Sequence, residues 1–325
     1  MERVRLSLGT AIHMNLLKGE RIPHFSTAFL MTYREGRCDA NCAFCPQARE
    51  STSSRNRLSR IAWPDFAYAD VKAEYSTLHS FSRICIQSLN YPDAINDVLF
   101  LVKETRSVTD TPISVSIHPL NRTNLRKLKD AGVTNIGIAF DACTQELFDK
   151  VKGTGRGFSY RWDLHEKALN DALEIFGNGR VTTHLMIGLG ETESEAVEFL
   201  FKMKRMGVSV GLFAFTSIKG TSLERRKSPN LDSYRRIQII RHLLHRDAIS
   251  RNDVEVNEVG EVRLKIPELE MSEYLSSGAA FQVSGCAGCN RPFYNERPSG
   301  TMYNYPCPLS KEEIQISIKE SGLWP

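Results

Sequence analysis

The chain has 325 residues, of which 41% are hydrophobic and 25% charged, and its formal net charge is +4. This length suffices for one large α/β domain with an appendage or for two domains, and the weak charge does not indicate nucleic-acid binding, which usually shows as a strongly basic surface. No apolar run approaches the ~20 residues that span a bilayer, and the first residues lack the pattern of a signal peptide. We therefore expect a cytoplasmic protein with neither a membrane nor a nucleic-acid partner.

Residues 1–26 are predicted to form a helical lead-in, because Ile12, Leu16 and Leu17 recur at helical spacing. Strand-like and helix-like segments then alternate along the chain. The strands are expected at residues 28–33, 83–88, 112–118, 133–140, 180–187 and 208–215. The helices are expected at residues 65–80, 92–107, 121–131, 144–151, 160–176, 193–206 and 231–246.

Six strand-then-helix units in series predict a parallel sheet with helices outside it, closed into a barrel or wound as an open sheet. In a barrel, the active site lies at the carboxyl ends of the strands. Polar motifs follow those ends here: a cysteine loop after the first strand, Asp141 after the fourth, and a Gly-Leu-Gly-Glu turn after the fifth. We therefore expect one shared site.

The cysteine loop contains Cys38, Cys42 and Cys45 in the spacing C-x3-C-x2-C, amid polar residues. Closely spaced thiolates bind an iron–sulfur cluster or zinc. Zinc would require a fourth ligand at a matching spacing, and no His or Cys follows nearby in the sequence. Three ligands suit a [4Fe–4S] cluster in which one iron stays open to a small molecule. In a reducing compartment, clustered cysteines indicate metal binding rather than disulfides.

After residue 250 the pattern changes. Residues 255–265 alternate and predict a short hairpin, and residues 283–308 have the composition of a loop but contain Cys286, Cys289 and Cys307. A second cluster is our preferred interpretation of these cysteines, and a structural zinc site is the alternative. Cys85, in the middle of a predicted strand, either completes this set or is a small buried hydrophobe.

Three further features are candidates for binding a small molecule. The carboxylate of Asp141 has acceptor oxygens suited to sugar hydroxyls, but read alone the residue also fits the N-cap of the next helix, and the pattern by itself favours the cap. Arg161 could pair with a carboxylate or simply be solvated. The Gly188-Leu189-Gly190-Glu191 turn exposes backbone groups suited to an adenosine moiety, but a single G-x-G is weakly specific.

The first cysteine motif resembles the signature of the radical S-adenosylmethionine (SAM) enzymes. From the second strand to the fifth helix the chain is similar to biotin synthase and its relatives, and the matching segments occur in order: Arg83–Ile86, Ala131-Gly132, the strand closing on Asp141, and Met186–Thr192. The resemblance implies an α/β fold, a partial (β/α)6 barrel of TIM type at residues 27–250, with a loop-rich extension at 251–325.

The same resemblance assigns roles to individual residues. The cysteines of the first motif would bind the [4Fe–4S] cluster that holds SAM. Asp141 would contact the ribose of SAM, Arg161 its methionine carboxylate, and the Gly188–Glu191 turn its adenine.

The departures from biotin synthase concern its second, sulfur-donating cluster, which is held by cysteines on three barrel strands and by an arginine. Only Cys85 matches here, and the other two cysteine positions fall near Ser114 and Thr182. The tail cysteines resemble a substitute that would hold an auxiliary [4Fe–4S] cluster. The segment that begins at Cys289 is similar to the tail of the archaeal-type, two-subunit lipoyl synthases.

This resemblance implies a sulfur-inserting enzyme of lipoyl synthase type. Reductive cleavage of SAM would give a 5′-deoxyadenosyl radical that abstracts hydrogen from a protein-bound octanoyl chain, and the auxiliary cluster would supply sulfur. The implied partners are a lipoyl-carrier protein or octanoylated peptide, a second radical SAM subunit, and an electron donor such as ferredoxin or flavodoxin.

Two other functions remain open. One is another radical SAM activity (biotin synthase-like, methyltransferase or rearrangement) with a structural or electron-transferring auxiliary cluster. The other is a zinc or iron–sulfur protein that binds a partner without catalysis. The basic runs Arg55–Arg57 and Arg225–Lys227 are read as solvated loop charge, with a docking surface for an acidic partner as the alternative.

Overall fold

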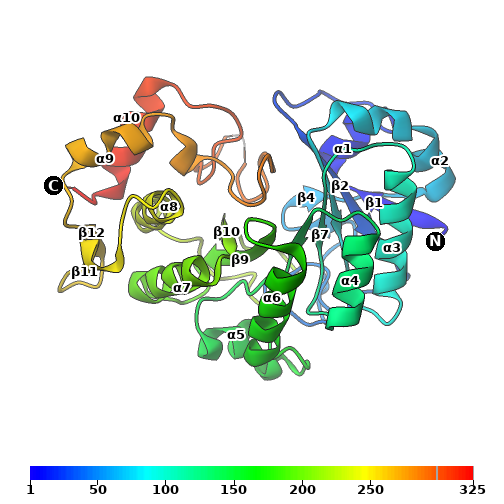
Figure 1. Ribbon diagram of the computed structural model, residues 1–325, viewed down its shortest axis with the longest axis horizontal. Helices are drawn as coiled ribbons and strands as arrows, with labels where there is room; N and C mark the ends of the chain where they lie inside the picture. The colour runs from blue at the N-terminus through cyan, green and yellow to red at the C-terminus, as the bar shows by residue number, and fades with distance from the viewer. Residues whose placement is uncertain (298, 325) are drawn as a thin grey trace.

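The computed structural model describes residues 1–297 and 299–324 and contains an eight-stranded sheet of order β10-β9-β8-β7-β6-β2-β1-β5 (Figure 1). Its parallel strands are β2 (Thr27–Thr32), β6 (Arg83–Gln87), β7 (Ile113–Ser116), β8 (Asn135–Gly137), β9 (Val181–Ile187) and β10 (Ser209–Ala214). They pair in chain order, and the sheet ends at β10 on one side. The fold is thus the expected partial (β/α) barrel of TIM type.

Helices follow the parallel strands β6 to β10 and pack outside the sheet (Figure 1). They are α3 (Ala94–Arg106), α4 (Arg122–Asp130), α5 (Gln145–Val151), α6 (Trp162–Phe176), α7 (Glu193–Met206) and α8 (Leu231–His245). Local signals set their ends: Thr192 and Glu195 form a capping box at the start of α7, and Gly207 ends it with a φ of 82°.

Alternation along the strands separates the two faces of the sheet. Ala28 and Leu30 of β2 pack into the large core beneath the helices, whereas Phe29 and Met31 belong to a second apolar cluster. Cys85 of β6 pairs with Phe29 in register and joins this second cluster. Because successive strand side chains point to opposite faces, Cys85 faces the barrel interior, as the sequence permitted.

The N-terminal region differs from the predicted helical lead-in. It forms β1 (Arg3–Leu6) and the short helix α1 (Leu8–His13), and β1 pairs antiparallel with β2 and with β5 (Asp65–Ala67). The predicted helix at 65–80 accordingly begins later and is split into α2 (Tyr68–Ala73) and the 3₁₀ helix η1 (Tyr75–Ser80). The reason is tertiary: β2 is buried along its whole length and requires a neighbour on this side.

The remaining elements are short or C-terminal. They are β3 (Arg57–Leu58), β4 (Ile61–Ala62), η2 (Thr154–Arg156), η3 (Arg251–Asp253), β11 (Val254–Val256), β12 (Val262–Leu264), α9 (Glu268–Leu275), η4 (Ala279–Phe281) and α10 (Lys311–Ser321). The predicted hairpin at 255–265 is confirmed by β11 and β12. The two helices of the C-terminal extension, α9 and α10, lie at the end of the molecule opposite β1 (Figure 1).

The tail is anchored on α8 and then returns to the sheet. Arg235 of α8 is 1% exposed and donates hydrogen bonds to the carbonyl oxygens of Met302 and Tyr303. Residues 282–297 contain no helix or strand and pass along the barrel interior. This irregular segment carries Cys286 and Cys289.

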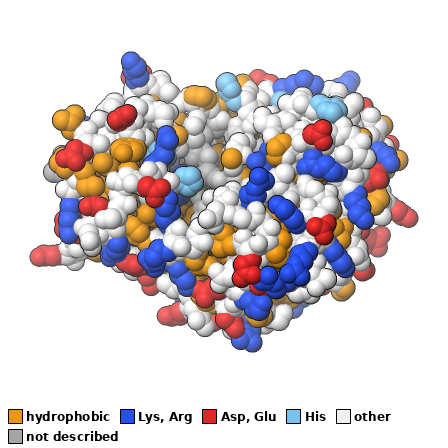
Figure 2. All heavy atoms as spheres, in the orientation of Figure 1, with side chains coloured by type: hydrophobic (Ala, Val, Ile, Leu, Met, Phe, Trp, Pro, Cys, Tyr) orange, Lys and Arg blue, Asp and Glu red, His pale blue; other side chains and the backbone are white. Residues whose placement is uncertain are grey.

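The surface is mixed in charge. On the face shown in Figure 2, Lys and Arg side chains over α4 and α6 are interspersed with Asp and Glu side chains. Among the described residues, no helix is both long enough and apolar enough to cross a membrane.

Candidate active site

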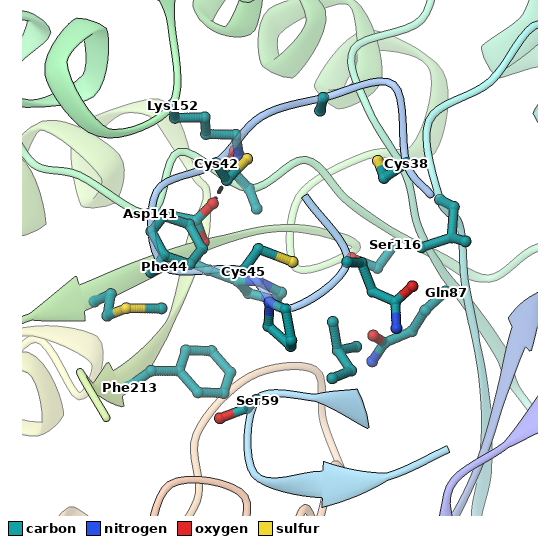
Figure 3. Close-up of a pocket in the computed structure, with 18 of the residues that line it drawn as sticks. Cys38, Cys42, Phe44, Cys45, Ser59, Gln87, Ser116, Asp141, Lys152 and Phe213 are labelled. Atoms are coloured by element: carbon teal, nitrogen blue, oxygen red, sulfur yellow. Dashed lines mark hydrogen bonds and ion pairs between the residues drawn. The ribbon is translucent and has the colours of Figure 1, made fainter. Parts of the chain in front are cut away.

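The cysteines of the first motif line one cavity at the carboxyl ends of the strands. Cys38, Cys42 and Cys45 lie on the loop that follows β2 and face this cavity from one side (Figure 3). Its volume is about 210 Å³. We call it the motif cavity. Its other lining residues include Gln87, Ser116, His118, Asp141, Lys152, Tyr160, His184, Phe213, Arg291 and Tyr294.

Backbone hydrogen bonds fix the loop in place. The N–H of Cys38 donates to the carbonyl oxygen of Gln47 at 3.1 Å, and that of Cys45 donates to the carbonyl oxygen of Cys42 at 3.0 Å. The Sγ of Cys38 accepts from the N–H of Asn90 at 3.1 Å. Ala43 donates to Val151 at 2.7 Å, which ties the loop to the end of α5. The three thiols are therefore held by a rigid frame.

The electrostatics of the thiols favour a cationic ligand. Burial raises the pKa of Cys45 to about 12 and also raises the pKa values of Cys38 and Cys42 above the ordinary thiol value. Thiols in such surroundings stay protonated unless a metal stabilises the thiolate. The loop can hold an iron–sulfur cluster, and it leaves the other side of the cavity for a small molecule.

Asp141 is in the cavity, but with a partner that the sequence did not reveal. Its Oδ2 accepts from Nζ of Lys152 at 2.7 Å, and the two side chains are 12% and 7% exposed (Figure 3). Its backbone has a φ of 67°, which is uncommon for a residue other than glycine. The N-cap of α5 is Thr144, so the alternative role of Asp141 as a helix cap is wrong. Lys152 belongs to no sequence motif.

Several buried polar atoms of the cavity lack a partner among the described residues. They are Oε1 of Gln47, Nε2 of Gln87, Nδ1 of His118 and Nε of Arg291. Burial lowers the pKa of His118 to about 4 and that of His184 to about 3, so both imidazoles are neutral near pH 7. Buried polar groups are normally hydrogen-bonded. The lining therefore suits a polar ligand.

Arg161 is not brought into this cavity. It occupies the N-cap position of α6, its side chain is 59% exposed, and it forms an ion pair with Asp163 at 2.6 Å. The role expected for it at the methionine carboxylate is not supported by this arrangement. The alternative, a solvated surface arginine, matches its position.

The Gly188–Glu191 turn follows β9 but lies outside the cavity lining. The carboxylate of Glu191 accepts from the N–H groups of Gly188, Leu189 and Gly190 at 2.6, 3.0 and 3.0 Å. The backbone donors expected to face an adenine are thus occupied. Gly188 has a φ of 107°, and a Cβ there would lie 2.8 Å from Cδ of Pro229. The glycine is required by the turn and its packing.

A second group of cysteines lies deeper in the barrel. Cys85 of β6 and the tail residues Cys286 and Cys289 line one small cavity, which we call the tail cavity. The Sγ of Cys286 lies 3.4 Å from Oγ of Ser114 and 4.0 Å from Oγ1 of Thr182. The tail therefore places a sulfur beside the two strand positions at which biotin synthase was expected to have cysteines.

Hydrogen bonds to several strands hold this part of the tail. Nε of Arg83 donates to the carbonyl oxygen of Ala287 at 2.8 Å, and Oγ1 of Thr27 accepts from the N–H of Asn290 at 3.1 Å. Thr27 and Arg83 are the first residues of β2 and β6. The tail cysteines thus enter at the amino ends of the strands, whereas the motif cysteines follow the carboxyl end of β2.

Arg291 connects the two cavities. It is 9% exposed and lines both of them. Its Nη2 lies 3.9 Å from Sγ of Cys85, and its guanidinium carbon lies 5.3 to 5.6 Å from the ring centroids of Phe29, Phe213 and Tyr294. Cys307, by contrast, does not line the tail cavity. Arg291, and not Cys307, lines this cavity together with Cys85, Cys286 and Cys289.

Within residues 1–297 and 299–324, no three His, Cys, Asp or Glu side chains converge closely enough to bind one metal ion. A [4Fe–4S] cluster distributes its ligands over four iron atoms. Such a cluster accepts more widely spaced ligands than a single ion does.

Comparison with known proteins agrees with this geometry. The model of the Radical SAM superfamily matches residues 36–203, more than half of the chain, and that segment contains the cysteine loop and strands β6 to β9. The chain belongs to the radical SAM superfamily. This family binds a [4Fe–4S] cluster and SAM, and the three half-buried thiols with the unpartnered polar lining of the motif cavity fit both groups.

Biotin synthases are similar to this chain at low identity. The chain is 24% identical over 204 residues to biotin synthase of Acetivibrio thermocellus and 25% identical over 204 residues to that of Methanococcus maripaludis. Each match covers 62% of this chain and about three fifths of the relative. This radical SAM enzyme is thus similar to biotin synthases over about three fifths of their length, and this similarity does not assign its substrate.

Solved structures confirm the fold. The crystal structure of methylornithine synthase (PylB) aligns with a TM-score of 0.51 at 18% identity, covering 71% of this chain and 67% of that one. The hydrogenase maturase HydG from Carboxydothermus hydrogenoformans aligns with a TM-score of 0.52 at 13% identity, covering 96% and 69%. At these identities the likeness concerns the fold alone.

Proposed function

We propose that this radical SAM enzyme inserts sulfur into an unactivated C–H bond of an octanoyl chain carried by a protein, as in lipoyl synthases. The carrying observation is the placement of two cysteine groups at opposite ends of one barrel interior, with Arg291 lining the cavities of both. Sulfur insertion requires a C–H bond to lie between a radical source and a sulfur source, and this arrangement provides that position.

In this proposal Cys38, Cys42 and Cys45 hold the cluster that binds SAM. When bound, the cluster and SAM together use one electron from a donor of the ferredoxin or flavodoxin class to generate the 5′-deoxyadenosyl radical that removes a hydrogen atom from the substrate. The buried pair Lys152 and Asp141 orients polar groups of SAM beside the cysteine loop.

Cys85, Cys286 and Cys289 would hold an auxiliary [4Fe–4S] cluster, with Arg291 beside it in place of Cys307. In this proposal that cluster is consumed as a substrate, because its sulfide leaves with the product. The substrate radical forms a C–S bond as one Fe–S bond is lost, and the unpaired electron passes to iron. One such bond forms per SAM, so a lipoyl group requires two, and we propose that a second radical SAM subunit forms the other.

A basic cavity at the mouth of the barrel supports a protein-borne substrate. Arg57, Arg60, Lys219, Arg225 and Arg297 line a cavity of about 680 Å³. It brings together one residue from each of the two basic runs of the sequence. Among the described residues, none of these five side chains forms an ion pair with an acidic group; burial, together with the charges of Arg297 and Arg57, lowers the pKa of Arg60.

The basic cavity adjoins the site, since Thr216 lines both it and the motif cavity. We propose that it receives the acidic surface of a carrier protein. Arg57→Glu/Arg225→Glu is expected to lower kcat/KM for an octanoylated acidic carrier domain roughly tenfold at low salt, with no change for a short neutral octanoyl peptide. Arg126→Glu/Lys127→Glu, with the same charge change on α4, is the control; equal effects of both variants would contradict the docking role.

The sulfur-insertion proposal is tested with anaerobically reconstituted protein, SAM, dithionite and an octanoyl-lysine peptide. Wild type is expected to form 5′-deoxyadenosine and a thiolated peptide, with loss of acid-labile sulfide. Cys289→Ala is expected to retain 5′-deoxyadenosine formation and lose thiolation. Formation of 5′-deoxyadenosine by wild type without thiolation or sulfide loss would favour the alternative of an auxiliary cluster that is structural or transfers electrons.

A further inference from the structure

A third cavity, of about 370 Å³, lies beside β2 and is lined mainly by hydrocarbon. We call it the apolar chamber. Its apolar lining comes from α1, β2, the β3–β4 hairpin and the tail, and includes Ile12, Phe25, Phe29, Ile61, Trp63 and Phe293. The roles proposed so far do not involve this chamber.

The chamber reaches the site between the two cysteine groups. Gln87, Arg291 and Tyr294 line both the chamber and the motif cavity, and Arg291 also lines the tail cavity. A linear group lying in the chamber therefore has one end at the place where the three cavities meet. The other polar residues that line the chamber are Ser7, Glu20 and Arg60.

Three buried hydrogen-bond donors in the lining lack an acceptor among the described residues. They are Nε1 of Trp63, Nε2 of Gln87 and Nε of Arg291, whose residues are 1%, 8% and 9% exposed. A buried donor without an acceptor is costly. A ligand that is mostly hydrocarbon but carries a carbonyl oxygen would pack against the apolar lining and accept a hydrogen bond from one of these donors.

We propose that the apolar chamber binds the saturated acyl chain of the substrate, with its distal carbons at Gln87 and Arg291 and its carbonyl oxygen accepting from Trp63. The identity of the chain as octanoyl rests on the proposed function. The chamber itself predicts only a medium-length, unbranched, saturated acyl group. In this proposal Trp63 is a positioning residue, and the walls of the chamber select the length of the acyl chain.

The test measures binding separately from sulfur transfer. Peptides of one sequence carrying Nε-acetyl-, butanoyl-, hexanoyl- or octanoyl-lysine are titrated anaerobically into the reconstituted full-length protein with SAM present. For wild type, the Kd is expected to fall about fourfold for each added methylene, the factor that corresponds to burying one CH₂. Octanoyl should then bind far more tightly than acetyl.

Two variants probe the chamber. Ala62 lines it, and Ala62→Phe is expected to abolish the chain-length dependence with iron content unchanged. Ala73→Phe, the same change at an exposed position ending α2, is expected to behave as wild type. Trp63→Phe keeps an aromatic ring without the N–H, and should weaken octanoyl binding about 2- to 12-fold with the length dependence preserved.

Equal affinity for acetyl and octanoyl peptides, or unchanged length dependence in Ala62→Phe, would overturn the proposal. If thiolated product forms but the Kd does not depend on chain length, the proposed function stands and the acyl-binding role of the chamber is rejected. Length-dependent binding that is lost in Ala62→Phe, with 5′-deoxyadenosine but no thiolated product, would support the chamber and reject sulfur insertion. The two failures are therefore distinguishable.

Discussion

We predict that the tail residue Cys286 can be replaced as a cluster ligand by a cysteine at position 114 of strand β7. Sγ of Cys286 lies 3.4 Å from Oγ of Ser114, so a cysteine at position 114 would place its sulfur close to the position vacated in Cys286→Ala. With two [4Fe–4S] clusters, wild type should contain about eight irons per chain and Cys286→Ala about four. Cys286→Ala/Ser114→Cys is expected to recover about eight.

The assay is iron and acid-labile sulfide per chain after anaerobic reconstitution, with the electron paramagnetic resonance of the reduced clusters. Cys286→Ala/Ser107→Cys is the matched control, because Ser107 follows α3 at the surface, and it should remain at about four irons. If Cys286→Ala retains about eight irons, Cys286 is not a ligand. If Cys286→Ala/Ser114→Cys contains no more iron than Cys286→Ala, the sulfur of Cys286 does not occupy the strand position, and the prediction is wrong.

Three further predictions concern the motif cavity and its surroundings. Glu191→Gln should lower the free energy of unfolding by about 1.5–3 kcal/mol and leave the Kd for SAM nearly unchanged, as measured by denaturation and titration; a large loss of SAM affinity at full stability would restore the adenine-binding role. Arg161→Ala should leave the Kd for SAM and the free energy of unfolding nearly unchanged, whereas Lys152→Met leaves a buried aspartate without its partner and should cost about 3–5 kcal/mol of stability; equal free energies of unfolding for the two variants would contradict this. Burial lowers the pKa of His165 to about 3 from 6.5, so the unfolded chain takes up this proton first and stability is lost as the pH falls below about 6.5, by up to about 1.4 kcal/mol per pH unit; His165→Phe should reduce this slope in urea unfolding, and an unchanged slope would show that His165 does not contribute.

The order of strands and helices could be predicted because hydrophobic spacing records burial directly. The strand-then-helix units from residue 27 onward all occur, and Glu193–Met206 was bounded correctly by its capping residues. The N-terminal strand was missed because β1 owes its structure to pairing with β2. The helix α10 was missed although Ile314 and Ile318 are buried at helical spacing, since the flanking loop composition dominated the interpretation.

Only the parts of the site that depend on the local spacing of residues could be predicted from the sequence. The C-x3-C-x2-C loop and the Cys286-x2-Cys289 turn carry their own signal. The roles transferred to Arg161 and to the glycine turn depended on the direction in which the backbone points these groups. In the structure Arg161 pairs with Asp163, and the N–H of Gly188 donates to Glu191. Lys152 lies in no pattern. Arg291, two residues after Cys289, could have been found by seeking the arginine of the biotin synthase cluster.

The most direct test of the central claim follows the sulfur atom. Protein reconstituted with ³⁴S-sulfide, freed of unbound sulfide and given SAM, dithionite and an octanoyl-lysine peptide for a single turnover is expected to yield a thiolated peptide that contains ³⁴S. Unlabelled sulfur in the product, or 5′-deoxyadenosine formed with the full complement of cluster sulfide retained, would contradict the account.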